Sequence, residues 1–254
     1  MKAKKSLGQH FLRSGKALNK IIEVGRIVPG ETVLEIGPGE GALTRKLLEA
    51  GARVIAIEKD DGLYEQLKRE NLENLELIHA DILKFDLALV DVSYKLIANI
   101  PYNITGAILE KFLSAENQPG LAVLLVQKEV AKRIVDKKGS VLSISIQAYG
   151  KPRYVETVKA GSFAPTPKVD SAIIAIENIS KDLFKEFSEE KFFKMLKTGF
   201  KSKRKKLSSN LASAFGKEKV SEAFQKLKIS DNTRAEELDL ATWAQIAREI
   251  LWYN

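Results

Sequence analysis

The chain has 254 residues, of which 44% are hydrophobic, so it can bury one large core or a core plus a small second domain, which argues against disorder or a fibre. Its 41 Lys and Arg residues outnumber 33 Asp and Glu residues, and this excess predicts a polyanionic partner or an anionic membrane. Cysteine is absent and His10 and His79 are the only histidines, which argues against thiolate chemistry and against a metal site. No apolar run could span a bilayer and the first residues lack the apolar centre of a signal peptide, so we expect a cytoplasmic protein without a membrane partner.

Short β-rich runs alternate with helix-like stretches between residues 31 and 127. The runs show little polar alternation, as strands of a parallel sheet buried on both faces do, and they cover 32–37, 53–60, 75–81, 95–100 and 121–127. Apolar residues at helical spacing mark 42–51, 62–71 and 104–114. The repeating order predicts a Rossmann-like α/β fold, which the runs at 152–160 and 171–177 extend as an antiparallel edge pair.

The last quarter of the chain is Lys-rich and helix-like, with no strand signal. Its helical stretches cover 192–200, 207–215, 220–228 and 240–251. We therefore predict two domains, an α/β domain over residues 1–180 and a small all-helical domain over 181–254. Trp243 and Trp252 are expected in the core of the helical domain, since buried aromatic residues at helical spacing are the commoner case.

A glycine-rich turn follows the first strand of the predicted sheet. Gly37, Gly39 and Gly41 alternate there, so the backbone can turn sharply and approach a ligand at the carboxyl edge of the sheet. Glu58 ends the second strand, about where an acid reaches ribose hydroxyls, and Asp81 follows the third, where it could accept from an adenine amino group. An NAD dehydrogenase stays possible, but the spacing G-x-G-x-G favours a ligand without pyrophosphate, such as S-adenosylmethionine.

The fourth strand ends in the tetrapeptide Asn99, Ile100, Pro101 and Tyr102, the most specific motif of the chain. The side-chain oxygen of Asn99 and the main-chain carbonyl of Ile100 could accept from the N6 amino group of an adenine as it receives a methyl group. Pro101 holds the preceding residue extended, and Tyr102 could stack on a base pulled out of its helix. The alternative is an Asn-Pro turn that merely closes a strand.

Four segments in order resemble the KsgA family of small-subunit ribosomal RNA adenine N6,N6-dimethyltransferases. KKSLGQHFL resembles its N-terminal signature, IGPGEGALT its first cofactor motif, NIPYNIT its catalytic motif and SFAPTPKVDSAII a motif on the substrate side. The resemblance covers essentially the whole chain. It implies S-adenosylmethionine-dependent dimethylation of adenines in small-subunit (16S) ribosomal RNA, with a role in the biogenesis of that subunit.

The resemblance also implies roles for individual residues. Those that would contact S-adenosylmethionine are His10, Leu12, Gly37, Gly39, Glu58, Asp81 and Asn99. Within this set Glu58 would bind the ribose and Asp81 the adenine, and many bacterial members have Asn in place of His10. Phe163 would flank the target adenine opposite Tyr102, unless it is an ordinary core residue before a Pro-rich turn.

Two basic segments contain no acidic residue, one before Glu23 and one between Lys191 and Lys217. They predict phosphate contacts that position an RNA without reading its sequence. The predicted RNA-binding residues are Lys4, Lys5, Lys201, Lys203, Arg204, Lys205 and Lys206. The expected partner is a partly assembled small ribosomal subunit bound by a monomer. Two alternatives stay open, a large-subunit methyltransferase of the macrolide-resistance type and a non-catalytic assembly factor.

Overall fold

The computed structural model describes residues 9–90, 92–136, 139–202 and 204–251. The chain divides into two compact units. The first comprises residues 1–132 and 151–179, and the second comprises 133–150 and 180–254, each within the described ranges. Each unit is considered by itself below.

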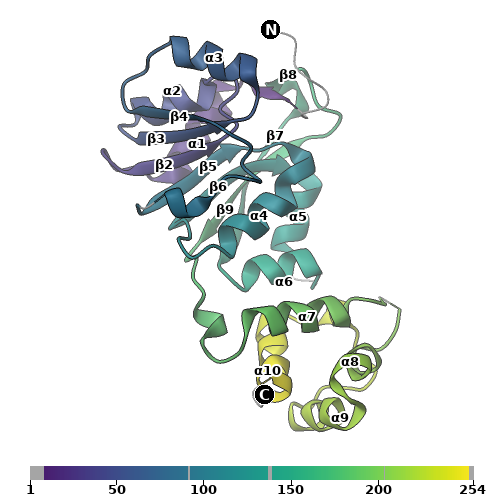
Figure 1. Ribbon diagram of the computed structural model, residues 1–254. Coiled ribbons are helices and arrows are strands. Elements are labelled where there is room, and N and C mark those ends of the chain that lie inside the picture. Colours follow the sequence, from purple (N-terminus) through teal and green to yellow (C-terminus); the bar gives the residue numbers. More distant parts are fainter. Residues whose placement is uncertain (1–8, 91, 137–138, 203, 252–254) are drawn as a thin grey trace. The chain divides into compact units, whose positions relative to one another are not determined.

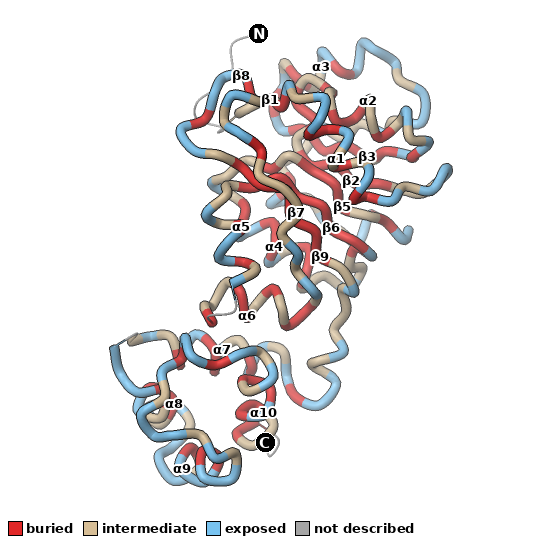
Figure 2. Tube along the Cα trace, turned by 180° about the vertical axis from the view of Figure 1, so that it is seen from behind, coloured by how far each residue is buried: buried red, intermediate tan, exposed pale blue. Residues whose placement is uncertain are grey.

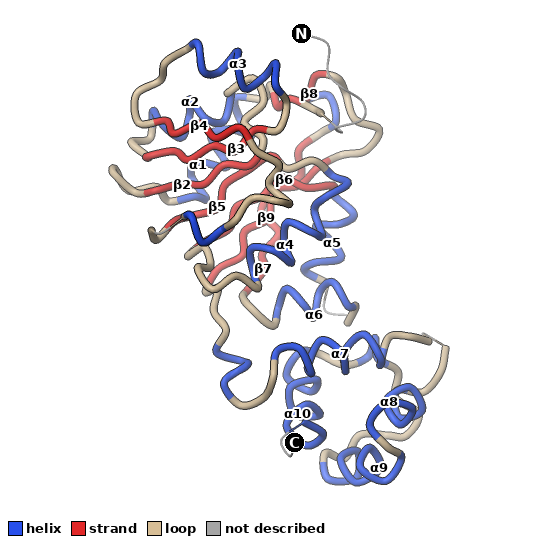
Figure 3. Tube along the Cα trace, viewed as in Figure 1, coloured by secondary structure: helices blue, strands red, loops and turns tan. Residues whose placement is uncertain are grey.

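A seven-stranded sheet forms the centre of the first unit (Figures 1 and 3). Its strands are β2 (Thr32–Ile36), β3 (Arg53–Glu58), β4 (Leu75–His79), β5 (Tyr94–Asn99), β6 (Leu121–Gln127), β7 (Lys151–Val158) and β9 (Ser171–Glu177). They lie in the order β4-β3-β2-β5-β6-β9-β7, and β2 to β6 are mutually parallel. The predicted Rossmann-like sheet is confirmed. The antiparallel strand β9 lies inside the sheet between β6 and β7, so β7 is the one member of the predicted antiparallel edge pair that lies at an edge.

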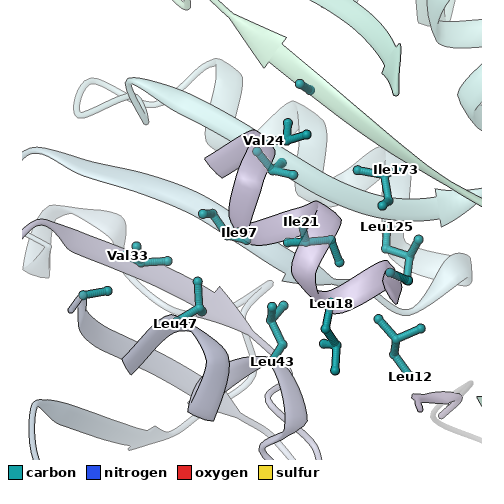
Figure 4. Close-up of a cluster of buried hydrophobic side chains, with 14 of the residues drawn as sticks. Leu12, Leu18, Ile21, Val24, Val33, Leu43, Leu47, Ile97, Leu125 and Ile173 are labelled. Carbon is teal, nitrogen blue, oxygen red and sulfur yellow. The ribbon is translucent and has the colours of Figure 1, made fainter. Parts of the chain in front are cut away.

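Helices cover both faces of this sheet because the parallel strands are apolar on both sides (Figures 1 and 2). Helices α1 (Gly15–Gly25), α2 (Ala42–Glu49) and α3 (Asp61–Arg69) belong to one face, and α4 (Thr105–Leu113) belongs to the other. Figure 4 shows the core under α1, where Leu18, Ile21 and Val24 lie against Ile97 of β5 and Leu125 of β6. Ser14 caps the N-terminus of α1, where its hydroxyl accepts from the N–H of Ala17.

A short strand near the N-terminus forms a separate two-stranded sheet. Strand β1 (Phe11–Leu12) pairs antiparallel with β8 (Phe163–Ala164), and the N–H of Arg13 donates to the carbonyl of Ser162. This pairing joins residues about 150 positions apart in the chain. It holds Gln9 and His10 beside the carboxyl edge of the sheet.

The second unit is helical. It contains α6 (Val141–Gln147), α7 (Glu189–Gly199), α8 (Leu207–Phe215), α9 (Lys217–Lys226) and α10 (Leu240–Leu251), and α5 (Lys128–Val135) runs from the first unit into it. Trp243 is fully buried in its core beside Phe192 and Leu211. Trp252 lies outside the described residues.

The helical unit includes a segment from the middle of the chain in addition to the residues after 179. Residues 133–150 precede the last two long strands in the chain but belong to the second unit, because Ile144 and Ala148 of this segment pack into its core. The N–H of Gly139 also donates to the carbonyl of Glu236. No helix among the described residues is both long enough and apolar enough to cross a bilayer.

Candidate active site

A cavity of about 210 Å³ lies at the carboxyl ends of β2, β3, β4 and β5. The strand order reverses between β2 and β5, and such a switch point is where open α/β sheets bind ligands. The predicted site residues that line the cavity are His10, Gly37, Gly39, Glu58, Asp81, Asn99, Ile100, Pro101 and Tyr102. The fold therefore brings the N-terminal segment, the glycine turn, both acids and the tetrapeptide to one place.

The glycine turn forms one wall of the cavity. Gly37 and Gly39 have φ angles of +62° and +60°, in the left-handed region that favours glycine. A Cβ added at Gly37 would meet no atom within 4 Å, so it would project into open space at the wall. A Cβ at Gly39 would lie 3.0 Å from the ring of Phe11. The turn thus leaves the backbone accessible to a ligand on one side and packs against β1 on the other.

Glu58 is buried at the end of β3 and is held by main-chain groups. Its carboxylate accepts from the N–H of Asp60 at 2.8 Å and from the N–H of Gly39 at 3.1 Å. Burial raises the pKa of Glu58, and these N–H groups offset part of that rise. The contact with Gly39 couples the acid to the glycine turn, so the two elements that a nucleoside would touch are fixed relative to each other.

Asp81 lies at the same edge of the sheet, after β4. One carboxylate oxygen accepts from the N–H of Leu83 at 3.0 Å and the other from Nζ of Lys59 at 2.9 Å. The hydrogen bond from Lys59 holds the pKa of Asp81 below its usual value, which keeps the carboxylate ionised and able to accept. Lys59 is the only lysine among the described residues that line the cavity.

The side chain of Asn99 has a defined orientation. Its amide Nδ2 donates to the carbonyl oxygen of His10 at 3.0 Å, and because a carbonyl only accepts, Oδ1 is the atom left to face another donor. Pro101 has φ −60° and ψ 131°, and its carbonyl accepts from the N–H of Ile104. The tetrapeptide is therefore fixed by hydrogen bonds at both ends.

Tyr102 begins the short 3₁₀ turn η3 (Tyr102–Ile104) and is fixed through its hydroxyl, which lies 2.6 Å from Oγ of Ser171. Burial raises the pKa of this phenol, so it stays neutral at ordinary pH. The ring facing it is His10, with centroids 5.7 Å apart and planes inclined by 21°. Nδ1 of His10 lies 2.8 Å from the carbonyl of Pro165, so it carries the proton in that contact.

Two predicted residues do not line this cavity. Leu12 is buried in the core under α1, although it borders a second, smaller cavity of about 30 Å³ beside the glycine turn. Phe163 is buried in the same core and is paired with Leu12 across β1 and β8. The structure therefore puts His10, and not Phe163, opposite Tyr102, because the β1–β8 pairing turns the phenylalanine inward.

Sequence reasoning missed Glu35, a buried carboxyl in β2. It is 1% exposed, borders the smaller cavity, and accepts from Oγ1 of Thr44 at 2.7 Å. Burial raises its pKa to about 8, and the nearby charge of Glu58 adds to the rise. An acid inside an otherwise apolar strand was the signal that could have identified it.

The basic segments differ in how their charges are used. The described N-terminal cations are paired: Arg13 with Glu40, Lys16 with Glu156 and Lys20 with Glu23. In the second unit four exposed cations stand before α8 and are called the α8 basic segment here; they are Lys201, Arg204, Lys205 and Lys206. Lys4, Lys5 and Lys203 lie outside the described residues.

The sheet order, the glycine turn and the two acids at successive strand ends define a Rossmann-like methyltransferase of the S-adenosylmethionine-dependent class. A family model described as "Ribosomal RNA adenine dimethylase" matches residues 1–251. The chain belongs to this family of ribosomal RNA adenine dimethyltransferases.

Similar proteins agree with that assignment. A "Ribosomal RNA small subunit methyltransferase A" of Dehalococcoides mccartyi (strain CBDB1) is 43% identical over 98% of this chain and 89% of its own. One from Fusobacterium nucleatum is 37% identical over 97% of each chain. Among solved structures, a dimethyladenosine transferase from Plasmodium falciparum has a TM-score of 0.84 at 27% identity and covers 96% of this chain and 100% of its own. The 23S rRNA methyltransferase ErmE has a TM-score of 0.75 at 26% identity over 94% and 99%. The large-subunit and non-catalytic alternatives are not favoured.

The cofactor of this family is S-adenosylmethionine, and the cavity residues fit it. Buried Glu58 can accept from a vicinal diol and Asp81 from an amino group. Lys59, the cavity's only lysine within the described chain, is paired with Asp81, so little cationic surface is left for a pyrophosphate. This donor set suits a nucleoside without phosphate better than NAD.

Proposed function

We propose that this enzyme dimethylates the N6 amino group of adenines in the small-subunit (16S) ribosomal RNA and thereby takes part in the biogenesis of that subunit. The observation that carries the proposal is the orientation of Asn99 in the cavity shared with Glu58 and Tyr102. Relatives at 37–43% identity named as small-subunit methyltransferases support the choice of RNA.

Bound S-adenosylmethionine supplies an electrophilic methyl group, and the protein has to make the N6 lone pair available to it. That lone pair is delocalised into the adenine ring. Oδ1 of Asn99 and the carbonyl of Ile100 accept hydrogen bonds from the N6 amino group, which holds it in place as its nitrogen becomes tetrahedral and then releases one proton to water for each methyl group gained. Positive charge grows on N6 during transfer, so two fixed carbonyl dipoles stabilise the transition state more than the ground state.

Tyr102 holds the target base by stacking. An adenine in the cavity must leave its helix, and stacking on an aromatic face is worth about 1–3 kcal/mol per base. The ring centroids of His10 and Tyr102 lie 5.7 Å apart. A base lying between two rings needs them about 7 Å apart, which is twice the spacing of stacked bases. The segment that carries His10 therefore has to shift outward, or the His10 ring to rotate, when the base enters.

The α8 basic segment is the proposed RNA contact of the helical unit. Its four described cations are exposed and stand in the segment before the first turn of α8, where they can bind phosphates. Such contacts orient an RNA without reading its bases, so specificity comes from RNA shape and from the extruded adenine.

The proposed substrate is a partly assembled small subunit, which the enzyme meets as a monomer in the cytoplasm. The site offers two acceptors and stacking rings but no code for neighbouring bases, so folded RNA geometry must select the target. The test compares kcat/KM on deproteinised small-subunit RNA, an adenine-bearing hairpin, isolated subunits and joined ribosomes, all from cells that lack the modification. Isolated subunits should be methylated fastest, and equal rates on the bare hairpin would contradict this choice of substrate.

A further inference from the structure

A second charged cluster lies at the carboxyl edge of the sheet, on the far side of the tetrapeptide from the glycine turn. Gln127 of β6, Ser171 of β9 and Val158 of β7 are in register in one row across the three strands. The residues that follow this row outward are Lys128, Asp170 and Lys159. Figure 3 shows the three strands side by side. Three charged side chains therefore stand together where the strands end.

The cluster is rich in positive charge. Nζ of Lys159 lies 3.2 Å from Asp170 Oδ2, and Nζ of Lys128 lies 3.7 Å from the same oxygen. The other oxygen of Asp170 accepts from the N–H of Ala160 at 3.1 Å. Two ammonium groups thus share one carboxylate, and Lys159 keeps 77% of its side chain exposed. Glu129, the nearest other acid along the chain, is paired with Lys132.

This cluster is adjacent in sequence to a residue that contacts Tyr102, which lines the cavity. Asp170 is followed by Ser171, whose hydroxyl lies 2.6 Å from the hydroxyl of Tyr102. A base stacked on Tyr102 with its N6 edge at Asn99 would direct its sugar away from Asn99. The backbone phosphates next to that sugar are the anions that cations near Tyr102 would meet.

We propose that Lys128 and Lys159 form a binding site for the RNA backbone phosphates that flank the extruded adenine. This inference rests on the proposed function and adds residues that belong to the catalytic unit, distinct from the α8 basic segment. The excess ammonium charge suits a phosphate, and ammonium groups bind phosphate as compact point charges. Asp170 holds the two lysines in place while no RNA is bound.

The alternative is an exposed ion pair that only fastens β9 to its neighbours. Such pairs contribute little to stability, because water screens them. A fastening role predicts a change in the thermal midpoint of the protein and no change in how RNA binding responds to salt. A phosphate site predicts an unchanged thermal midpoint and a weaker salt dependence of RNA binding.

The test uses the double variant Lys128→Gln/Lys159→Gln and the control Lys46→Gln/Lys185→Gln. The control removes the same charge from two surface lysines that are also ion-paired, with Glu49 and Asp182. On small subunits lacking the modification, the double variant should lose at least about tenfold in kcat/KM relative to the control, with a salt slope smaller by about 0.7–0.9 for each phosphate that is no longer bound. The dissociation constant for S-adenosylmethionine should stay within twofold of wild type in both.

A second measurement does not depend on turnover. An adenine-bearing RNA hairpin is made with ordinary linkages or with neutral methylphosphonates beside the target adenine. The neutral linkages should weaken binding to wild type and to the control but not to the double variant, and Lys128→Arg/Lys159→Arg should behave like wild type. If the double variant matches the control in both salt slope and linkage effect, the phosphate site is wrong. If wild type transfers no methyl group to adenine, the proposed function fails, and the hairpin comparison still decides on the two lysines.

Discussion

Replacing Glu35 by Gln tests how far burial controls the protonation of this carboxyl group. The carboxyl is 1% exposed, and its pKa of about 8 stands well above the ordinary value of 4.5. Because the folded state prefers the protonated form, the stability that Glu35 contributes is present below pH 4.5 and is lost as the pH rises toward 8. Integrated between pH 5 and pH 9, the loss is about 4 kcal/mol in wild type. Gln is neutral throughout and keeps an acceptor for Thr44.

The variant should therefore gain stability relative to wild type as the pH rises, by up to about 4 kcal/mol between pH 5 and pH 9. Urea unfolding followed by circular dichroism at several pH values gives the two profiles, and hydrogen exchange of β2 and β5 amides assigns the effect to the first unit. Parallel profiles for the two proteins would refute the reasoning about burial.

Three further outcomes follow from the site. Glu58→Ala should weaken S-adenosylmethionine binding by roughly 1.5–3 kcal/mol, the cost of removing a charge-assisted hydrogen bond, and an unchanged dissociation constant in titration calorimetry would remove Glu58 from the site. Tyr102→Ala should abolish most turnover while cofactor affinity changes little, so near-normal single-turnover methylation at saturating substrate would contradict the stacking role. Neutralising the α8 basic segment should flatten the salt dependence of RNA binding by up to about 0.7–0.9 for each phosphate that it no longer binds, and a slope equal to that of wild type would leave it a solvated surface.

The elements of the sheet could be predicted because their signals are local. Strands β6 and β9 each have six consecutive buried residues, and their predicted bounds match the structure. The glycine turn and the two acids follow directly from strand ends, so their meeting in one cavity also could be expected. Parallel strands bring their carboxyl ends to one edge whatever the loops between them do.

Features that depend on residues far apart in the chain could not be predicted. Strands β1 and β8 have two residues each and exist only because they pair with each other, and that pairing decides that Phe163 is buried and His10 faces Tyr102. Helix α6 contains alternating β-branched residues, yet it is helical because Ser140 and Ser143 form a capping box and Ile144 packs into the helical unit. Such tertiary packing overrides local propensity.

The central claim is transfer of two methyl groups to N6 of adenines in small-subunit RNA, and nucleoside analysis tests it most directly. Small subunits from cells lacking the modification are incubated with enzyme and isotopically labelled S-adenosylmethionine, and the RNA of each subunit is digested and measured by mass spectrometry. Wild type should yield labelled N6,N6-dimethyladenosine in small-subunit RNA, and Asn99→Ala should yield almost none. Label that appears only in large-subunit RNA, or no dimethyladenosine with wild type, would contradict the account.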